Sequence, residues 1–265
     1  MIRRILAVAL ALVASSASAA DESVSAPFIT SPDEVVQRML ELAHTGPDDV
    51  VVDLGSGDGR IVIAAAQKFG ARGLGIEIDA GLVKTSRDNA LKAGVADRVT
   101  FQQGDVLAAD ISAASVVTVY LLPGLINRLP PVFLRRLSPG TRIVSHAFAM
   151  AGWRPDAVET VRVSQPHPGQ GPESTLYLWV VPAEVRGLWA ADGTRIRIHQ
   201  NFQEVELEGQ LLGRKISASR ASLRGRDIMW EANGLRFQGR LQGEIITGEL
   251  AGPDRRQPFA LRRAR

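Results

Sequence analysis

Hydrophobic residues in the first two thirds of the chain fall into two alternating patterns. Short continuous apolar runs, each ended by a glycine or a polar residue, predict buried parallel strands. The segments between them repeat apolar residues at a spacing of three to four, which predicts helices packed on a sheet. Strands are expected at 50–54, 73–77, 99–103, 115–120, 141–146, 157–164 and 174–181. Helices are expected from an N-cap at Ser31 to Gly46 and at 60–69, 80–93 and 123–137.

This alternation predicts an α/β fold, a doubly wound parallel sheet with helices on both faces, over residues 31–183. The last two of its seven strands are separated only by a Pro- and Gly-rich loop at 165–172, so we expect them to form an antiparallel pair at one edge. From 187 to 265 the pattern changes to short alternating runs separated by glycines. That pattern predicts a small antiparallel β C-terminal domain, either a meander or a half-barrel. Its runs are 194–199, 204–211, 215–223, 227–232, 236–241, 244–250 and 258–262.

The first 19 residues have the order of a secretory signal peptide. Arg3 and Arg4 precede an apolar run at 5–14, and Ala17-Ser-Ala19 forms a cleavage-type site. The run is too short to span a bilayer comfortably, so we expect export to the periplasm, with 20–30 as an extended lead-in segment. The alternatives are an uncleaved anchor in the inner membrane and a misassigned start codon, which would leave the protein in the cytoplasm. No later segment is long and apolar enough to be transmembrane.

Composition narrows the chemistry. Of the 265 residues, 45% are hydrophobic and 22% are charged, as in ordinary globular proteins. The absence of cysteine excludes disulfides, zinc-thiolate sites and thiol nucleophiles, and nothing in the sequence resembles a metal site. Between Arg186 and Arg265 there are 15 Lys and Arg but nine Asp and Glu. This basic segment suits an acidic partner or serves only as a structural cap, while Trp189 and Trp230 are too sparse to stack nucleic-acid bases.

The segment Asp53-Leu-Gly-Ser-Gly-Asp-Gly59 follows a predicted strand and opens a predicted helix. Glycines at such a turn let the backbone approach a ligand closely. A dinucleotide fingerprint would read G-x-G-x-x-G, and an acid before it would repel a pyrophosphate. A phosphate loop would need a following Lys-Ser/Thr, which is absent. An acid here suits S-adenosyl-L-methionine (SAM), which carries a cationic sulfonium and an α-amino group.

Two further acids lie at predicted strand ends. Glu77 ends the second strand, 22 residues after Gly55, where a carboxylate can accept both ribose hydroxyl protons. Asp105 follows the third strand, where a carboxylate can accept the adenine amino hydrogens. The plainer alternatives are a charged strand end for Glu77 and a turn residue for Asp105.

The fourth and fifth strands are expected to end at Tyr120 and His146. In a doubly wound sheet, ligands bind outside the carboxyl ends of the strands. We therefore expect Tyr120 to orient the methyl acceptor and His146 to assist proton removal. The alternative for each residue is ordinary packing or a satisfied hydrogen bond.

From Pro27 to about Asp156 the chain resembles the small class I methyltransferases related to the ATP synthase c-subunit lysine methyltransferase. The resemblance implies a seven-strand class I methyltransferase Rossmann-like fold and lysine ε-amino methylation. The chain departs from that family through its predicted signal peptide and its β-rich C-terminal extension. The matching segments are Pro27-Phe-Ile-Thr-Ser-Pro32, Asp53-Leu-Gly-Ser-Gly-Asp-Gly-Arg-Ile-Val62, Gly75-Ile-Glu-Ile-Asp79, Val117-Thr-Val-Tyr-Leu-Leu-Pro123, Ser145-His-Ala-Phe-Ala-Met150 and Trp153. The residues expected to bind the cofactor are Asp53, Gly55, Ser56, Gly57, Gly59, Glu77 and Asp105.

The main hypothesis is therefore a SAM-dependent methyltransferase that acts on a protein lysine. An apolar mouth at Leu121, Leu122 and Pro123 would favour the neutral lysine amine by desolvation. The fourth strand lacks the Asn/Asp-Pro-Pro-aromatic motif of adenine and glutamine methyltransferases. The alternatives are a small-molecule or envelope acceptor, and a non-catalytic exported binding module.

Overall fold

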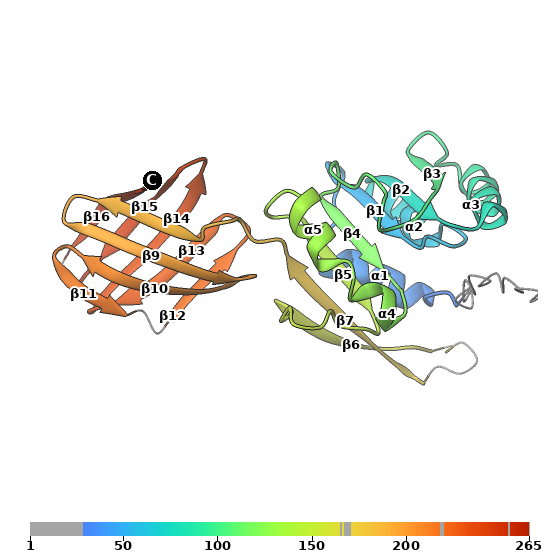
Figure 1. The fold of residues 1–265 in the computed structure, drawn as a ribbon. Coiled ribbons are helices and arrows are strands. Elements are labelled where there is room, and N and C mark those ends of the chain that lie inside the picture. The colour runs from blue at the N-terminus through green and yellow to red at the C-terminus, as the bar shows by residue number, and fades with distance from the viewer. Residues whose placement is uncertain (1–28, 165, 167–170, 218–219, 254, 265) are drawn as a thin grey trace, which may run out of the picture.

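The computed structural model describes residues 29–164, 166, 171–217, 220–253 and 255–264. The predicted signal peptide at 1–19 and most of the lead-in segment at 20–30 lie outside the described residues. Figure 1 shows an α/β unit followed by a β-barrel. In the described part of the chain, every helix is too short or too polar to cross a membrane.

The α/β unit is built around one seven-stranded sheet in the order β3-β2-β1-β4-β5-β7-β6. The first five strands run parallel, and β6 and β7 form an antiparallel pair at one edge, as predicted from the sequence. The structure adds that β7 lies between β5 and β6 and pairs antiparallel with both. The strands are β1 (Val50–Leu54), β2 (Arg72–Glu77), β3 (Val99–Gln103), β4 (Val116–Val119), β5 (Arg142–His146), β6 (Ala157–Arg162) and β7 (Glu173–Val180).

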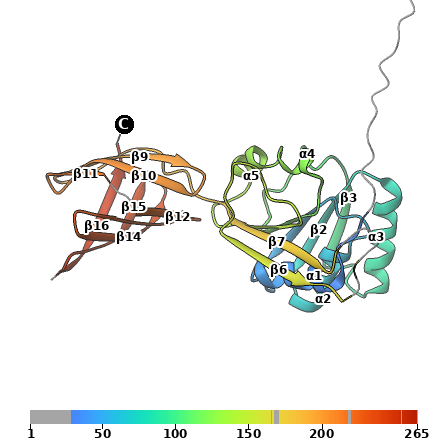
Figure 2. The same ribbon diagram turned by 90° about the horizontal axis from the view of Figure 1, so that it is seen from below.

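Five helices cover the two faces of this sheet (Figures 1 and 2). Neighbouring residues of β1 point to opposite faces, so Val51 belongs to the apolar cluster under α1, α2 and α3, while Val52 belongs to the cluster under α4 and α5. The helices are α1 (Asp33–Leu42), α2 (Arg60–Phe69), α3 (Ala80–Lys92), α4 (Pro123–Ile126) and α5 (Pro130–Arg136).

One predicted helix, 123–137, is two short helices in the structure. The break lies between Ile126 and Pro130. Pro130 and Pro131 have no N–H to donate to the carbonyls of the preceding turn, so the α-helical ladder cannot continue through them. Proline is nevertheless well suited to the first turn of a new helix, where α5 uses it.

The C-terminal part is a closed barrel, which corrects the prediction of a small antiparallel domain or half-barrel. Consecutive strands pair antiparallel, and β16 pairs with β8, a strand missed by the sequence analysis, to close the ring. β11 and β12 both pair with β10 and share one position, so the ring has eight positions. The strands are β8 (Gly187–Ala191), β9 (Thr194–Asn201), β10 (Glu204–Leu211), β11 (Arg214–Ser217), β12 (Arg220–Arg224), β13 (Asp227–Ala232), β14 (Leu235–Gln242), β15 (Ile245–Ala251) and β16 (Arg256–Arg263).

The barrel is attached to the edge of the sheet where the parallel strands begin. β7 ends at Val180, opposite Arg142 at the start of β5. Gly225 in the β12–β13 turn lies against Gly140, since a Cβ added to Gly225 would be 3.2 Å from the Gly140 Cα. The Gly225 carbonyl accepts a hydrogen bond from the Ala183 N–H at 2.7 Å. The barrel therefore lies opposite the carboxyl ends of the parallel strands.

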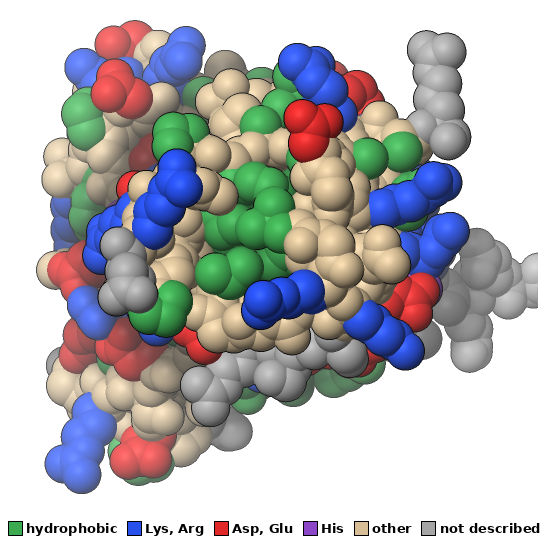
Figure 3. Space-filling model, turned by 90° about the vertical axis from the view of Figure 1, so that its left-hand side faces the viewer, with side chains coloured by type: hydrophobic (Ala, Val, Ile, Leu, Met, Phe, Trp, Pro, Cys, Tyr) green, Lys and Arg blue, Asp and Glu red, His purple; other side chains and the backbone are tan. Residues whose placement is uncertain are grey.

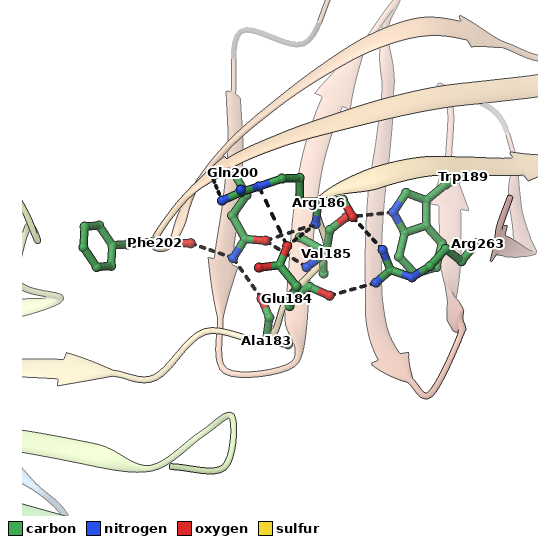
Figure 4. A network of polar contacts seen from close by, with 8 residues as sticks. All are labelled: Ala183, Glu184, Val185, Arg186, Trp189, Gln200, Phe202 and Arg263. Carbon is green, nitrogen blue, oxygen red and sulfur yellow. Dashed lines mark hydrogen bonds and ion pairs between the residues drawn. The ribbon is translucent and has the colours of Figure 1, made fainter. Parts of the chain in front are cut away.

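The linker at 183–186, between β7 and β8, closes the end of the barrel that faces the α/β unit, called here the junction end, with a polar network (Figure 4). The Arg263 guanidinium carbon lies 4.5 Å from the centroid of the Trp189 ring and the side chain donates to two carbonyls of the linker 183–186. The Trp189 indole donates to a third linker carbonyl at 2.8 Å. The Gln200 amide bonds to linker groups and to the Phe202 carbonyl. These bonds satisfy backbone groups that would otherwise be left without partners at this end of the barrel.

Candidate functional site

The loop from Gly55 to Gly59, called here the glycine loop, connects β1 to α2. Gly55, Gly57 and Gly59 have φ angles of 79°, 53° and 82°, in the region that favours glycine. A Cβ at Gly59 would lie 2.6 Å from the Phe101 ring, and one at Gly55 would lie 2.7 Å from the Leu121 side chain. The loop therefore needs glycine for both its backbone conformation and its close packing.

Asp53 is buried at the end of β1, with 2% of its surface exposed. The Thr118 hydroxyl on the neighbouring β4 donates to its carboxylate at 2.7 Å. Burial raises the pKa of Asp53 to about 7, and the charges of Glu77 and Asp58 also raise it, while the Thr118 bond opposes the shift. A cationic group placed beside Asp53 would favour its ionised form. Sequence reasoning missed Thr118, because only the pairing of β1 with β4 brings it to Asp53.

Glu77 ties the end of β2 to the glycine loop. One carboxylate oxygen accepts the Gly57 N–H at 2.9 Å. The other accepts the N–H groups of Ile78 and Asp79 at 2.8 and 3.0 Å. A carboxylate has about four acceptor positions, so these three bonds fix its orientation and leave capacity for a further donor.

Ser56 and Asp105 are placed differently from the other residues expected to bind the cofactor. The Ser56 N–H bonds to the Ile76 carbonyl, and its buried hydroxyl lies 2.6 Å from where a Cβ of Gly75 would be. Both polar groups of Ser56 thus face β2. Asp105 is exposed after β3 and accepts the Leu107 N–H at 2.9 Å. That bond forms a local turn at the same edge of the sheet as Asp53 and Glu77.

His146 and Tyr120 contact each other at the ends of β5 and β4. Their ring centroids are 4.1 Å apart, and the Phe148 ring is stacked with that of Tyr120 at a centroid distance of 6.4 Å. The imidazole is buried, and Nδ1 is 2.8 Å from the Ser31 hydroxyl. Burial lowers the pKa of His146 to about 4, so the ring is neutral near pH 7 and is a weak base. This environment favours a positioning role over the proton removal expected from the sequence.

The predicted N-cap role of Ser31 is wrong. The N-cap of α1 is Pro32, which makes no side-chain capping bond. The Ser31 hydroxyl instead reaches His146, and its carbonyl accepts a bond from Arg60, which is paired with Asp58 at 2.7 Å. Ser31 therefore connects the first residues of α2 to the end of β5. The only sequence signal for this role is its position in the Pro27–Pro32 segment of the family resemblance.

Two cavities lie beside the helices, and among the residues of the glycine loop only Asp58 lines one of them. One of about 270 Å³ crosses α2 and includes Asp58, Arg60 and Asn89. The other, of about 290 Å³, lies between α3 and β3. None of the residues expected to bind the cofactor lines either cavity. Buried polar groups therefore locate the candidate site better than cavity volume does.

The matches to known proteins concentrate in the α/β unit. Residues 53–157 match the ANTKMT methyltransferase domain family. A protein-lysine N-methyltransferase from Saccharolobus islandicus is 40% identical over 156 residues, which cover 58% of this chain and 93% of that protein. The human ATP synthase c-subunit lysine N-methyltransferase is 32% identical over 135 residues, 51% of this chain and 57% of that protein. The chain thus spans little more than half the length of this human relative.

A solved structure supports the same comparison. An RNA methyltransferase from Salinibacter ruber, in complex with S-adenosyl-L-homocysteine, is 54% identical to the aligned part of this chain. The alignment covers 59% of this chain and 96% of that one, with a TM-score of 0.53. The family match ends at residue 157, before β7, so the barrel lies outside it.

Proposed function

Because the chain belongs to the ANTKMT family of methyltransferases, we propose that it methylates the ε-amino group of a lysine in a protein substrate. The chain is a SAM-dependent methyltransferase. The lysine acceptor is supported by the Saccharolobus and human relatives, whose names specify lysine N-methylation. In the structure, the proposal rests on the buried Asp53 carboxylate next to the glycine loop, where the cationic groups of SAM would bind.

The carboxyl edge of the sheet suits the chemistry of SAM. Asp53 offers an anionic group for a ligand with cationic sulfonium and α-amino groups, and its raised pKa means that such a ligand would bind with release of a proton. The glycine loop allows close backbone approach. Glu77 is held by three backbone amides and retains acceptor capacity for ribose hydroxyls. Bound SAM supplies an activated methyl group, because its sulfur leaves as a neutral thioether.

The acceptor side is formed by the ends of β4 and β5. A lysine nitrogen would have to be neutral, with its proton lost to water, before it could accept the methyl group that bound SAM would supply. Leu122, 48% exposed, and the partly buried Leu121 offer an apolar approach that lowers the pKa of a lysine by desolvation. The His146 ring, held by Ser31, and the Tyr120 ring against it then orient the amine, and His146 is too weak a base to take its proton.

Radiolabelled SAM tests the acceptor class. The purified chain is incubated with cell-envelope and soluble protein fractions, and labelled proteins are analysed by peptide mass spectrometry. We expect methyl groups on lysine side chains, and labelling reduced about tenfold or more in an Asp53→Asn variant at low SAM concentration. Asp97→Asn, which changes an exposed acid in the turn before β3, is the matched control and should label normally. Label confined to small metabolites would contradict a protein acceptor.

RNA is a second acceptor class, favoured by the name of the Salinibacter protein. The same incubation with total RNA distinguishes the two classes, since label would then be sensitive to ribonuclease and absent from lysine residues. That outcome would keep the methyltransferase and replace its substrate.

Export is a separate proposal that rests on residues 1–19, with Arg3, Arg4 and the apolar run at 5–14. A fusion of residues 1–25 to a reporter that is active only outside the cytoplasm should be active. An inactive fusion would favour the cytoplasmic alternative. An active fusion that stays uncleaved and membrane-bound would favour an inner-membrane anchor.

A further inference from the structure

Two hairpins at opposite ends of the barrel place a bulky apolar residue in left-handed backbone. Phe202 in the β9–β10 turn has a φ of 53°, and Leu212 in the β10–β11 turn has a φ of 49°. This conformation is unfavourable for such residues, and the β13–β14 turn uses Asn233 and Gly234 instead. Phe202 is compensated because its ring stacks on Trp153 of the α/β unit, with centroids 4.9 Å apart.

Leu212 has no such compensation within the described residues. Its side chain is 45% exposed, and it belongs to none of the three apolar clusters of the described chain. Phe202 shows that an apolar residue at this kind of turn position can serve as a docking contact. By the same logic, Leu212 is available for a contact with a partner other than the described residues.

Leu212 lies at the end of the barrel that faces away from the α/β unit, and the centre of this end is apolar. The outer end of the barrel is defined by the turns at 191–194, 211–214 and 232–235 and by the described residues between β15 and β16. No described segment covers it as the linker covers the junction end. Leu235 and Phe259 pack against the interior cluster but stay partly exposed. Figure 3 looks onto this end and shows apolar side chains at its centre, with Lys and Arg side chains and several Asp and Glu side chains around them.

The rim of the outer end is basic. The four segments that form it, 190–195, 211–215, 231–236 and the described residues of 250–256, contain six cations and two acids. The described cations are all exposed, and two of them also pair with acids along the strands, Arg236 with Glu231 and Arg256 with Glu249. The six cations are Arg195, Arg214, Lys215, Arg236, Arg255 and Arg256.

This combination fits one kind of occupant best. The barrel interior is filled, because Trp189, Trp230 and Phe237 are at most 2% exposed, so a lipid chain cannot enter it. A second copy docked end to end would bring two basic rims together. Anionic lipid headgroups match the rim, while Leu212 and the apolar centre can reach the boundary just below the headgroups.

We propose that the outer end of the barrel docks on an anionic lipid bilayer through Leu212 and its basic rim. The carboxyl edge of the sheet, with Asp53 and His146, lies on the opposite side of the α/β unit from the barrel. Docking would therefore leave the methyltransferase site facing away from the bilayer and open to a substrate in solution. This proposal does not depend on which acceptor is methylated.

Vesicle sedimentation of the full chain tests the docking. We expect the chain to bind vesicles of phosphatidylcholine with about one third phosphatidylglycerol several-fold more strongly than pure phosphatidylcholine vesicles, with the difference lost at high salt. Binding to the neutral vesicles measures what the apolar run at 5–14 contributes. Leu212→Asn creates the Asn-Gly sequence that this turn type prefers, so the fold is retained. It should reduce binding to the anionic vesicles about threefold or more.

Charge variants sharpen the test. Arg214→Gln combined with Lys215→Gln should reduce anionic-vesicle binding about tenfold or more, since each surface cation contributes several-fold. Two controls should bind as the wild type does: Met229→Gln, which removes an apolar side chain of 48% exposure from the barrel wall, and Arg226→Gln with Arg262→Gln near the junction end. The proposal is overturned if the wild type does not prefer anionic vesicles, or if the outer-end variants bind like these controls. An acidic protein would then be the better candidate.

Discussion

The two units of the molecule use their charged and polar side chains in opposite ways. In the α/β unit, Asp53, Glu77 and His146 are buried at one edge and held by other groups of the protein. In the barrel, pairs such as Arg240 with Asp227 lie on the exposed wall. Burial shifts the pKa values of Asp53 and His146, whereas exposed pairs are screened by water and contribute little. The α/β unit is therefore organised for chemistry, and the barrel for presenting a surface.

The largest expected effect is at the buried edge. Asp53→Asn and Glu77→Gln should each weaken SAM binding about 10- to 100-fold, because hydrogen bonds to charged groups contribute about 1.5–3 kcal/mol. Isothermal titration calorimetry measures this directly. Arg240→Gln breaks an exposed barrel pair and should leave SAM binding unchanged. If the edge variants bind like Arg240→Gln, the cofactor assignment of these residues is wrong.

The same two units can be compared by the effect of a glycine substitution in each on the free energy of unfolding. Gly59→Ala should lower the free energy of unfolding by about 2–4 kcal/mol, because the new Cβ meets the Phe101 ring in addition to the backbone strain. Gly234→Ala in a barrel turn has no atom within 4 Å of the new Cβ and should lower it by about 1 kcal/mol through backbone strain alone. Chemical denaturation provides the measurement. Equal losses would show that crowding in the glycine loop contributes nothing.

The pH dependence of SAM binding follows from the raised pKa of Asp53, about 7. Below this pH the ligand must displace a proton, so the dissociation constant should rise up to about tenfold per unit of falling pH and level off above pH 7. Titrations between about pH 5.5 and pH 7.5 test this. The same raised pKa means that Asp53 stabilises the ligand-free fold less as pH rises from about 4 to 7. Asp53→Asn should remove the slope in binding, and a slope that persists in that variant assigns it to another group.

The smallest expected effects come from the two strained barrel turns. Phe202→Asn relieves the backbone but loses the stack on Trp153, so we expect a net loss of about 1 kcal/mol in unfolding free energy. Leu212→Asn relieves the same kind of strain and gives up an exposed side chain, so we expect a gain of up to about 1 kcal/mol. Thermal unfolding of both variants measures the difference. A loss for Leu212→Asn would show that the side chain already packs within the chain.

Much of the fold could be predicted, because the spacing of apolar residues and the positions of the glycines and prolines between elements are local properties of the sequence. The seven strands of the α/β sheet and the antiparallel β6–β7 pair at its edge follow the predicted pattern. The prediction of one helix at 123–137 was wrong because it relied on the apolar spacing and gave too little weight to the two prolines. These lack the N–H groups that a continuous helix needs. Barrel closure could not be predicted, since the β8–β16 pairing joins segments more than 60 residues apart.

The candidate site divides in the same way. The glycine loop, Glu77 and the acid at the end of β1 are recognisable from spacing along the chain. The contacts that tune them are not: Thr118 reaches Asp53 and Ser31 reaches His146 across 65 and 115 residues. Burial shifts the pKa values of Asp53 and His146, and the extent of that burial cannot be predicted from the local sequence pattern.

By itself, the sequence determined where the chain turns, which segments alternate between apolar and polar residues, and that an acidic residue precedes a glycine-rich turn. Those features depend on neighbouring residues and their backbone preferences. Only the tertiary structure decided that Ser31 bonds to His146 instead of capping α1, and that Phe202 finds Trp153 while Leu212 remains exposed. Hydrogen-bond partners, desolvation and docking surfaces depend on which distant segments meet, and folding alone brings those segments together.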